Sequence, residues 1–400
     1  MRLIQILILR QTTLVGNFIK LRTMKFIMNI GNRLSAIVTL LLLLFMVSCT
    51  NDEGESYPIT LTKVTTVSDL SASISEASLG DFIAIHGTGL DLQNIDSILI
   101  NDVKVDLLDA YSENDILYLK IPVKLAVDIT NKIYIYNSLG CQEIPFKTNS
   151  PALKLDRMFN EYTNPGDTIM IYGDFFELYE IDSLNAVVDF DGKISKVIES
   201  GNNYLTAQVP KDVEENIKVK VKGLKYDVEA VCPGRYRDKE CMIMDFDESV
   251  PSNMANVITD INDKNRLSGN YLRIDDKSEW NSWWYIAEIS DVPFTDDMLD
   301  NYENYVIKCE FYTANQLIDG KIKFCNYLFW DAAPMEWNPT DFVVQNFNRW
   351  ETITLPFVVN RSSTYTDNSY YHSFNMRLEI DATIARNFAF DNIRICKKGD

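Results

Sequence analysis

Histidine is almost absent from this sequence: only His86 and His372 occur among its 400 residues. A Ser–His–Asp triad or a metal centre with several histidines is therefore not expected. The seven cysteines form no C-x-x-C pair and no other zinc-binding spacing, so a cysteine zinc site is not expected either. These absences exclude several common kinds of catalytic centre.

Negative charge is missing from the first 48 residues, which carry six basic residues and no acid. Within this segment, residues 34–47 form an almost unbroken apolar run. The run is too short for a transmembrane helix of about 20 residues. A basic flank, a short apolar run and a small residue predict a secretory signal peptide over residues 1–48. Met24 and Met28 would each start a signal of normal length, and we expect translation to begin at one of them.

Basic residues are scarce in the rest of the chain. Removal of the signal peptide leaves 32 of the 38 basic residues against 57 acidic ones, a net charge of −25. Such a surface repels nucleic acid and acidic polymers. Neutral partners are expected, and nucleic acid is excluded as a partner.

The segment Met46-Val47-Ser48-Cys49 resembles the bacterial lipobox, in which a cysteine follows an apolar run and small residues. The acidic residues 50–55 are similar to the export signal of lipoproteins on the outer face of Gram-negative gut anaerobes. The resemblance implies that Cys49 is acylated and anchors the chain in the outer membrane, facing the exterior. A lipid anchor with several acyl chains needs no spanning helix. An ordinary signal peptide that contains a cysteine is the alternative.

The six later cysteines are in an exported chain, where disulfides are permitted. Cys232–Cys241 and Cys309–Cys325 are pairs close enough in sequence to be considered. Buried free thiols are the alternative, which we favour slightly.

Tryptophan is absent from the first 279 residues, and five of the six lie between Trp280 and Trp337. Indole offers a large flat apolar surface, and its N–H requires a partner when buried. Amide, hydroxyl and carboxylate side chains are interspersed with these rings. Flat aromatic faces ringed by such groups suit a neutral polysaccharide, so this stretch predicts the centre of a glycan-binding domain.

The candidate residues are ranked by position. In a strand predicted over residues 283–289, alternation places Trp284 on the face of Glu288, and Trp283 on the opposite face. The face with Glu288 is expected to be open. Trp330 ends a predicted strand and Trp337 follows in a loop, where aromatic residues lack a packing role. The predicted stacking residues are Trp284, Trp330 and Trp337, with Trp280, Trp283 and Tyr285 as second choices, and the predicted hydroxyl-binding residues are Glu288, Asn326, Asp331 and Asn338.

Two segments before the tryptophans repeat one another at an offset of 86 positions. Leu79-Gly80-Asp81 matches Pro165-Gly166-Asp167, and similar pairs follow, which indicates a duplicated domain. Each copy of about 90 residues has short strand-like runs separated by turn signals, a pattern typical of immunoglobulin-like β-sandwiches. The order of motifs resembles the IPT/TIG family of bacterial surface proteins. We expect a leash over residues 49–56 and two such domains over residues 57–150 and 151–236, joined at prolines that stiffen the junctions.

Residues 237–400 form a third predicted domain. Helical periodicity is weak there, and eight predicted strands indicate a jelly-roll β-sandwich. Residues 350–356 and 388–395 resemble strands shared by carbohydrate-binding jelly rolls, so Trp350 is assigned to the core. First and last strands of related jelly rolls meet at a calcium site, and Asp245, Asp247 and Asp391 are candidate ligands for a structural calcium.

The order of parts resembles the surface glycan-binding proteins of polysaccharide-utilisation systems in Bacteroidota, and surface glycan-binding protein B in particular. The resemblance implies capture, without cleavage, of a neutral plant polysaccharide such as xyloglucan or another β-linked glucan. It also implies a SusD-like, TonB-dependent importer complex as a partner. Apart from the structural calcium considered above, no cofactor is expected.

Two alternatives remain open. Glycoside hydrolases need two carboxylates about 5–9.5 Å apart, and any chain with 57 acids contains candidate pairs. A structural adhesin or a subunit of the importer is the other alternative.

Overall fold

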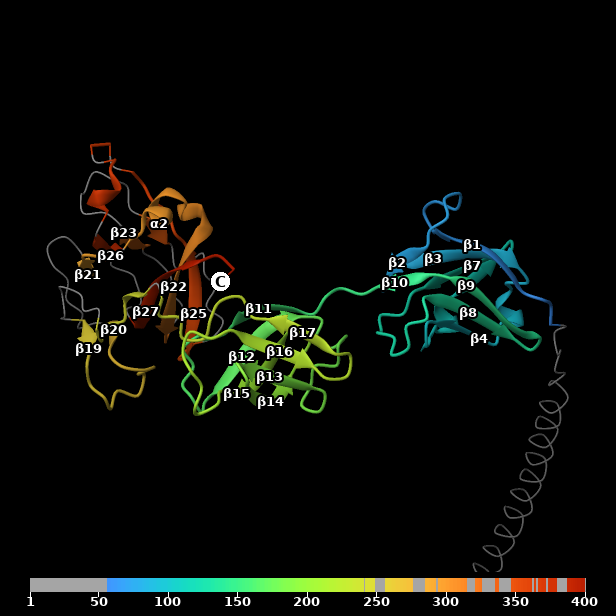
Figure 1. The fold of residues 1–400 in the computed structure, drawn as a ribbon, viewed down its shortest axis with the longest axis horizontal. Helices are drawn as coiled ribbons and strands as arrows, with labels where there is room; N and C mark the ends of the chain where they lie inside the picture. The colour runs from blue at the N-terminus through green and yellow to red at the C-terminus, as the bar shows by residue number, and fades with distance from the viewer. Residues whose placement is uncertain are drawn as a thin grey trace, which may run out of the picture.

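The computed structural model describes residues 56–399 apart from residues 241, 249–255, 276–284, 293, 315–320, 326–334, 338–346, 362, 365, 372 and 380–386. The regular secondary structure of the described residues is almost entirely β-strand (Figure 1). The strands surround three large apolar clusters. This confirms the all-β prediction. The predicted signal peptide, Cys49 and most of the leash lie outside the described residues. No helix within the described part of the chain has the length and apolar character needed to cross a membrane.

The first domain is a sandwich of two four-stranded sheets, with the orders β1-β3-β7-β6 and β5-β4-β8-β9, plus a short parallel pair, β10-β2. Its inward residues, such as Ile83, Leu117 and Ile135, are completely buried. The strands are β1 (Thr60–Thr66), β2 (Glu76–Ser78), β3 (Phe82–Thr88), β4 (Ser97–Ile100), β5 (Val103–Lys104), β6 (Tyr111–Glu113), β7 (Ile116–Lys120), β8 (Lys132–Asn137), β9 (Gly140–Pro145) and β10 (Lys147–Asn149).

The second domain has the same kind of architecture. Its strands lie in the order β11-β12-β15-β14-β13-β16-β17, and β14 bends from one sheet of the sandwich into the other. The strands are β11 (Lys154–Met158), β12 (Thr168–Asp174), β13 (Ala186–Phe190), β14 (Lys193–Ser200), β15 (Tyr204–Gln208), β16 (Val219–Gly223) and β17 (Val228–Val231).

The sequence repeat corresponds to equivalent hydrogen bonds in the two domains. Gly80 N donates to Ile121 O at 3.0 Å, and the equivalent Gly166 N donates to Val209 O at 2.9 Å. Strands β3 and β12, which follow these glycines, have the same length at an offset of 86 residues. The duplicated pattern therefore marks the same turn and strand in each sandwich.

Glycine in these strands is required by close backbone approach. A Cβ on Gly87 would lie 1.9 Å from Thr60 O, and one on Gly173 would lie 2.2 Å from Lys154 O. No side chain fits in either position. Both domains therefore need glycine where β1 pairs with β3 and where β11 pairs with β12. Asp191 and Gly192 form the hairpin turn between β13 and β14, since both residues have positive φ, 52° and 92°.

The third domain consists of two antiparallel sheets packed face to face, as a jelly-roll sandwich requires. Sheet G has the order β19-β20-β27-β22-β25, with β18 also paired to β27, and sheet H has the order β21-β26-β23-β24. The elements are β18 (Met242–Met244), β19 (Val257–Ile258), β20 (Tyr271–Ile274), β21 (Tyr285–Ser290), α2 (Asp296–Asp300), β22 (Tyr305–Thr313), β23 (Lys321–Cys325), β24 (Met335–Trp337), β25 (Trp350–Pro356), β26 (Ser373–Glu379) and β27 (Phe388–Lys397).

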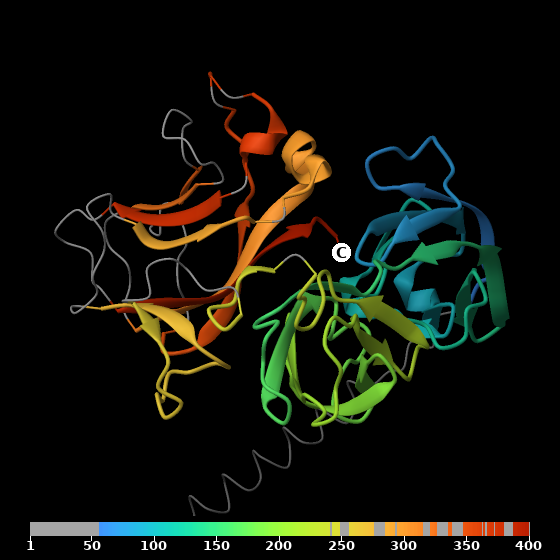
Figure 2. The same ribbon diagram turned by 60° about the vertical axis from the view of Figure 1, so that its left-hand side comes forward.

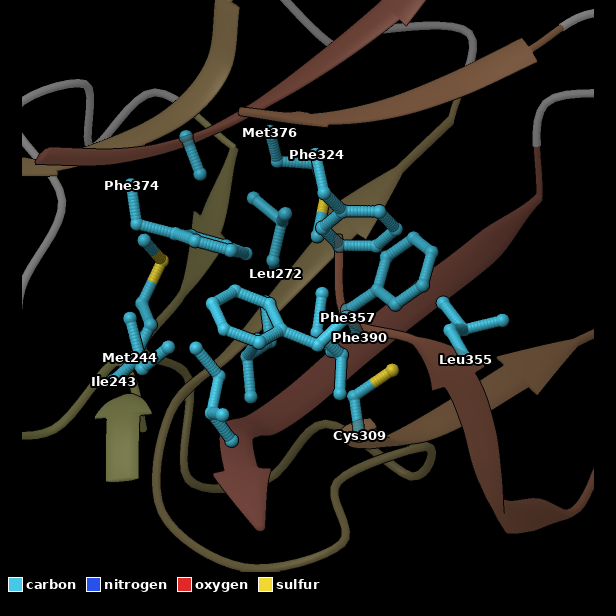
Figure 3. Close-up of a cluster of buried hydrophobic side chains, with 14 of the residues drawn as sticks. Ile243, Met244, Leu272, Cys309, Phe324, Leu355, Phe357, Phe374, Met376 and Phe390 are labelled. Atoms are coloured by element: carbon cyan, nitrogen blue, oxygen red, sulfur yellow. The ribbon is translucent and has the colours of Figure 1, made fainter. Parts of the chain in front are cut away.

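The core of the third domain fills the space between sheets G and H. Phe324, Phe374 and Met376 of sheet H face Leu355 and Phe390 of sheet G, and all five are buried (Figure 3). Each of the eight predicted strands overlaps an observed one, whereas β19, β24 and helix α2 were not predicted. Helix α2 begins after Thr295, whose hydroxyl caps it by accepting from Met298 N at 3.2 Å.

The cysteines whose side chains are described are free thiols. Cys232 and Cys309 are both buried and unpaired. The suggested pairs Cys232–Cys241 and Cys309–Cys325 are therefore wrong, and the favoured alternative of buried thiols is confirmed for these two residues. Burial raises the pKa of both thiols, so they behave as small apolar side chains in the core.

Candidate functional site

The predicted site residues lie in the strands of sheet H or next to those strands in the sequence. This sheet lies on the side of the third domain away from the second domain, whereas β22 and β25 of sheet G lie next to the second domain (Figure 1, Figure 2). One face of sheet H is covered by the core through Phe324, Phe374 and Met376. The opposite face is therefore the candidate functional surface.

Strand β21 shows which residues face the core. Ala287 is completely buried, Ile289 packs against the core, and Glu288 between them is half-buried. The predicted alternation is thus confirmed for these three residues, and Glu288 lies on the face away from the core. This is the face on which a hydroxyl-binding carboxylate was predicted.

The alternation does not extend to the tryptophans that precede β21. Tyr285 pairs with Arg377, but Ala287 pairs with Met376, so a β-bulge lies between Tyr285 and Ala287. A bulge places two residues opposite one and breaks the period of two. Assigning Trp284 to the face of Glu288 by counting residues is therefore not justified, although its role in binding remains a prediction.

Trp337 was predicted in a loop, and this is wrong. Met335, Glu336 and Trp337 form β24, which pairs with β23 through Trp337↔Ile322 and Phe324↔Met335. The strand is short and lies at the edge of sheet H, and a stretch with only three strand residues after Ala332-Ala333-Pro334 gives a weak signal. The backbone of Tyr285 and Trp337 is described, whereas their side chains lie outside the description.

The strand register shows which parts of sheet H carry the predicted residues. β21 begins and β24 ends at one end of the sheet, since Tyr285 and Lys323 both pair with Arg377, and Glu336 pairs with Lys323. β23 ends and β24 begins at the other end. Several of the predicted residues themselves lie outside the described residues: Trp280, Trp283, Trp284, Asn326, Trp330, Asp331 and Asn338.

Trp350 belongs to the core, as predicted. Only 9% of it is exposed, and its ring lies 5.6 Å from that of Tyr271 at an interplanar angle of 89°. Its Nε1 donates to Asn265 O at 2.7 Å, which satisfies the indole N–H. Together with Tyr312 it forms a small cluster on the outer face of sheet G.

The described residues give no support to a calcium site at Asp245, Asp247 and Asp391. No group of three or more potential ligands in the described part of the chain is arranged to hold a metal ion. Oδ1 of Asp245 accepts from the backbone N–H groups of Asp247 and Glu248, and Oδ1 of Asp247 accepts from Asn270 N. These carboxylates cap turns, which is the ordinary role of aspartate in loops.

Carboxyl groups with strongly perturbed pKa values were missed by the sequence reasoning. Burial raises the pKa of Glu310, Glu351 and Asp391, and at most 4% of each residue is exposed. None of the three lies on sheet H. Perturbed carboxyls often mark catalytic sites, but they also mark buried structural networks, and these three lie in or beside strands of sheet G.

The third domain matches a known family. Residues 236–397 match the model described as the surface glycan-binding protein B xyloglucan binding domain. The matched region includes both sheets G and H and all six tryptophans. Residues 156–229, within the second domain, match the IPT/TIG domain model. The resemblance to surface glycan-binding protein B is confirmed for the third domain, and the resemblance to the IPT/TIG family is confirmed for the second domain.

Solved structures share the fold. Surface glycan-binding protein PbSGBP-B from Prevotella bryantii is 18% identical, with a TM-score of 0.53 over 86% of this chain and 99% of that chain. SGBP-B from a complex xyloglucan utilization locus in Bacteroides uniformis is 15% identical, with a TM-score of 0.44 over 85% of this chain and 100% of that chain. The first likeness shows the fold, and the second is too distant to support an argument. No curated protein sequence matches the chain.

Proposed function

We propose that this protein is a lipoprotein of the outer membrane that faces the exterior and binds a neutral plant polysaccharide without cleaving it. Xyloglucan or another β-linked glucan is the favoured ligand, which the protein holds for uptake. The observation that carries the proposal is the match of residues 236–397 to a xyloglucan binding domain, within which all six tryptophans fall.

The binding surface is the face of sheet H that is not covered by the core. Trp284, Trp330 and Trp337 stack on sugar rings, with Trp280, Trp283 and Tyr285 as the next candidates. Glu288, Asn326, Asp331 and Asn338 bind hydroxyl groups. Support comes from Glu288, which lies on the face of sheet H away from the core.

Simple magnitudes suit such a site. One indole face covering about 100 Å² of sugar contributes at most about 2.5 kcal/mol, so three contribute roughly 7 kcal/mol before the cost of association. Hydrogen bonds then bring the affinity to the micromolar or millimolar range. Many anchored copies on one cell facing a long polymer gain avidity.

The first two domains serve as a spacer between the lipid on Cys49 and the binding domain. A strand of about eight residues spans about 26 Å, because each residue rises about 3.3 Å. Two sandwiches in series therefore add roughly 50 Å between the lipid and the binding domain. A SusD-like, TonB-dependent importer complex is the proposed partner that receives the polysaccharide.

A hydrolase is the second candidate. The carboxyl groups with raised pKa values among the described residues are buried at sheet G rather than placed in an open cleft, which favours binding over cleavage.

Affinity electrophoresis tests the proposal over a panel of polysaccharides: xyloglucan, mixed-linkage glucan, cellulose derivatives, mannan and an acidic control such as pectin. We expect retardation in a gel that contains a neutral β-linked glucan and none in the acidic control. If no neutral polysaccharide retarded the protein, the proposal would be overturned. New reducing ends after incubation with the same polymers would favour the hydrolase instead.

A further inference from the structure

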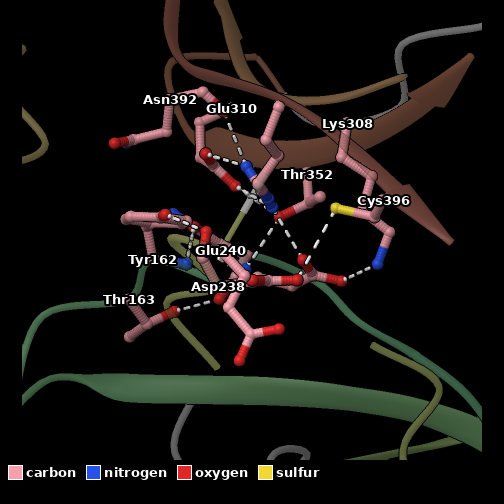
Figure 4. Close-up of polar contacts among 12 residues, drawn as sticks. Tyr162, Thr163, Asp238, Glu240, Lys308, Glu310, Thr352, Asn392 and Cys396 are labelled. Carbon is pink, nitrogen blue, oxygen red and sulfur yellow. Dashed lines mark hydrogen bonds and ion pairs between the residues drawn. The ribbon is translucent and has the colours of Figure 1, made fainter. Parts of the chain in front are cut away.

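The outer face of sheet G carries an unusual group of charged residues. Lys308 and Arg394 are neighbours across β22 and β27, and Glu310 and Thr352 are neighbours across β22 and β25. Arg394 and Glu310 are completely buried, although each carries a charge. Figure 4 shows Glu310, Lys308 and Thr352 within this network of polar contacts. Buried charges of this kind are stable only when partners surround them.

One partner lies in the same sheet, and a second comes from the second domain. Arg394 donates to Glu310 through two bonds of 2.9 and 3.1 Å, and its Nη2 also donates to Oε2 of Glu161 at 2.6 Å. Glu161 lies 233 residues earlier in the chain and binds Lys308 Nζ through Oε1, again at 2.6 Å. Two cations and two anions balance, so the cluster holds no net charge only when Glu161 is in place.

Backbone contacts continue the same interface. Thr352 N donates to Phe159 O at 2.8 Å, and Glu161 N donates to Thr352 Oγ1 at 2.7 Å. Thr352 lies in β25, which ends the described order of sheet G. An edge strand has unpaired N–H and C=O groups that favour unwanted pairing, and the second domain supplies the partner here.

Aromatic rings of the second domain cover the charged groups. The guanidinium of Arg394 lies 4.8 Å from the ring of Tyr162, whose hydroxyl donates to Asp238 O at 2.6 Å. The ring of Phe159 lies 5.7 Å from the guanidinium of Arg157 and 4.9 Å from that of Arg349. Cation–π contacts that exclude water strengthen such an interface.

The junction between the first and second domains is built differently. Val123 and Lys124 of the first domain line a shallow pocket together with Phe175, Glu177 and Glu180 of the second. Tyr179 binds the linker, its hydroxyl donating to Pro151 O at 2.6 Å. Leu125 of the first domain is a partly buried contact of the second domain's core.

We propose that the second and third domains act as one stiff unit, completed by the Glu161–Arg394–Glu310–Lys308 cluster, and that bending of the chain is confined to the linker around Pro151. The stiff unit then extends beyond the third domain. It includes the second domain, which precedes the start of the family match at residue 236. Sheet H keeps a fixed direction relative to the second domain, whatever ligand it holds.

Calorimetry of the full-length chain tests this inference. We expect two unfolding transitions, one for the first domain and one shared by the second and third. Glu161→Gln keeps the size of the side chain but removes its charge, which leaves Arg394 and Lys308 under-compensated. The shared transition should then fall by about 10 °C and split into two. Glu180→Gln is the matched control, because Glu180 pairs with Lys225 at a half-exposed position of the second domain. It should leave the shared transition whole.

Hydrogen exchange in the unsubstituted protein covers the case in which Glu161→Gln does not fold. The amides of Thr352 and Glu161 should exchange as slowly as those of core residues such as Ile171 and Phe311. Separate transitions for the second and third domains in the unsubstituted chain would overturn the inference. Exchange at Thr352 and Glu161 a hundredfold faster than in both cores would do the same.

Discussion

Ala287 is completely buried while Glu288, the next residue of β21, is half-buried on the opposite side of the strand. This relationship fixes the direction of sheet H: one face packs on sheet G, and the other faces away from it. Because the second domain covers part of sheet G, the outward face of sheet H is the surface left for a polymer. The proposed function depends on this arrangement.

Truncating the proposed stacking residues should weaken binding. Trp284→Ala, Trp330→Ala and Trp337→Ala should each raise the dissociation constant for xyloglucan about tenfold or more, because each removes up to about 2.5 kcal/mol of apolar contact. Affinity gels with graded polysaccharide concentrations measure the change. If all three variants bound as tightly as the unsubstituted protein, the aromatic surface would lie elsewhere.

Trp350 is the matched control for these tryptophans. Trp350→Ala should lower the free energy of unfolding by about 3–5 kcal/mol, because it leaves a cavity beside Tyr271 and Tyr312 and an unpaired Asn265 O. The affinity of the folded fraction for glycan should not change. Urea unfolding measures the first effect. A loss of affinity without a loss of stability would contradict the assignment of Trp350 to the core.

Gly234 should tolerate no side chain. It has a φ of +80°, and a Cβ there would lie 2.5 Å from Lys308 Nζ and 2.7 Å from Glu161 Oε1. Gly192 has a similar φ of +92° with no atom within 4 Å of its Cβ position. Gly192→Ala therefore isolates the backbone cost of about 1 kcal/mol, and Gly234→Ala should cost clearly more because it also displaces the ion pair. Equal losses in thermal unfolding of the two variants would mean that the ion pair does not constrain this position.

Asp391 should destabilise the protein at neutral pH. It is 1% exposed, its Oδ2 has no hydrogen-bond partner, and burial together with Glu310 raises the pKa of its carboxyl well above the usual value. Below the unfolded pKa of about 3.9 both states hold the proton, so the group has no effect on stability. As the pH rises above that value, the unfolded state loses the proton first, and the stability of the folded protein falls.

Asp391→Asn should remove this dependence, because the amide oxygen can still accept from Asn392 N as Oδ1 of Asp391 does. The variant should match the unsubstituted protein near pH 4 and exceed it increasingly towards pH 7, by about 1.4 kcal/mol for each unit by which the pKa is raised. Melting temperatures across this range measure the difference. A gain that shrinks as the pH rises would contradict the sign of the shift.

Strands and turns could be predicted because their signals are local. The Asp191-Gly192 turn, the repeated glycines and the strand-like segment from Phe388 to Ile395 each reveal their structure within a few residues. The β-bulge beside Tyr285 could not be predicted in this way. It depends on pairing with β26, about 90 residues later, and it invalidates the count that placed Trp284.

The cluster at sheet G was missed for the same reason. Glu161 and Arg394 are 233 residues apart, and nothing near Glu161 distinguishes it from the other acids of a strongly acidic chain. One signal was present: Arg394 stands between the apolar residues Ile393 and Ile395 in a predicted strand. A charged residue at such a position requires a buried partner, but the sequence does not say which.

Titration calorimetry of the full-length protein with xyloglucan oligosaccharides tests the central claim most directly. We predict saturable binding with a dissociation constant between about 1 μM and 1 mM, a negative heat-capacity change from aromatic burial, and no release of reducing ends. Absence of heat with these oligosaccharides and with those of every other neutral β-linked glucan would contradict it.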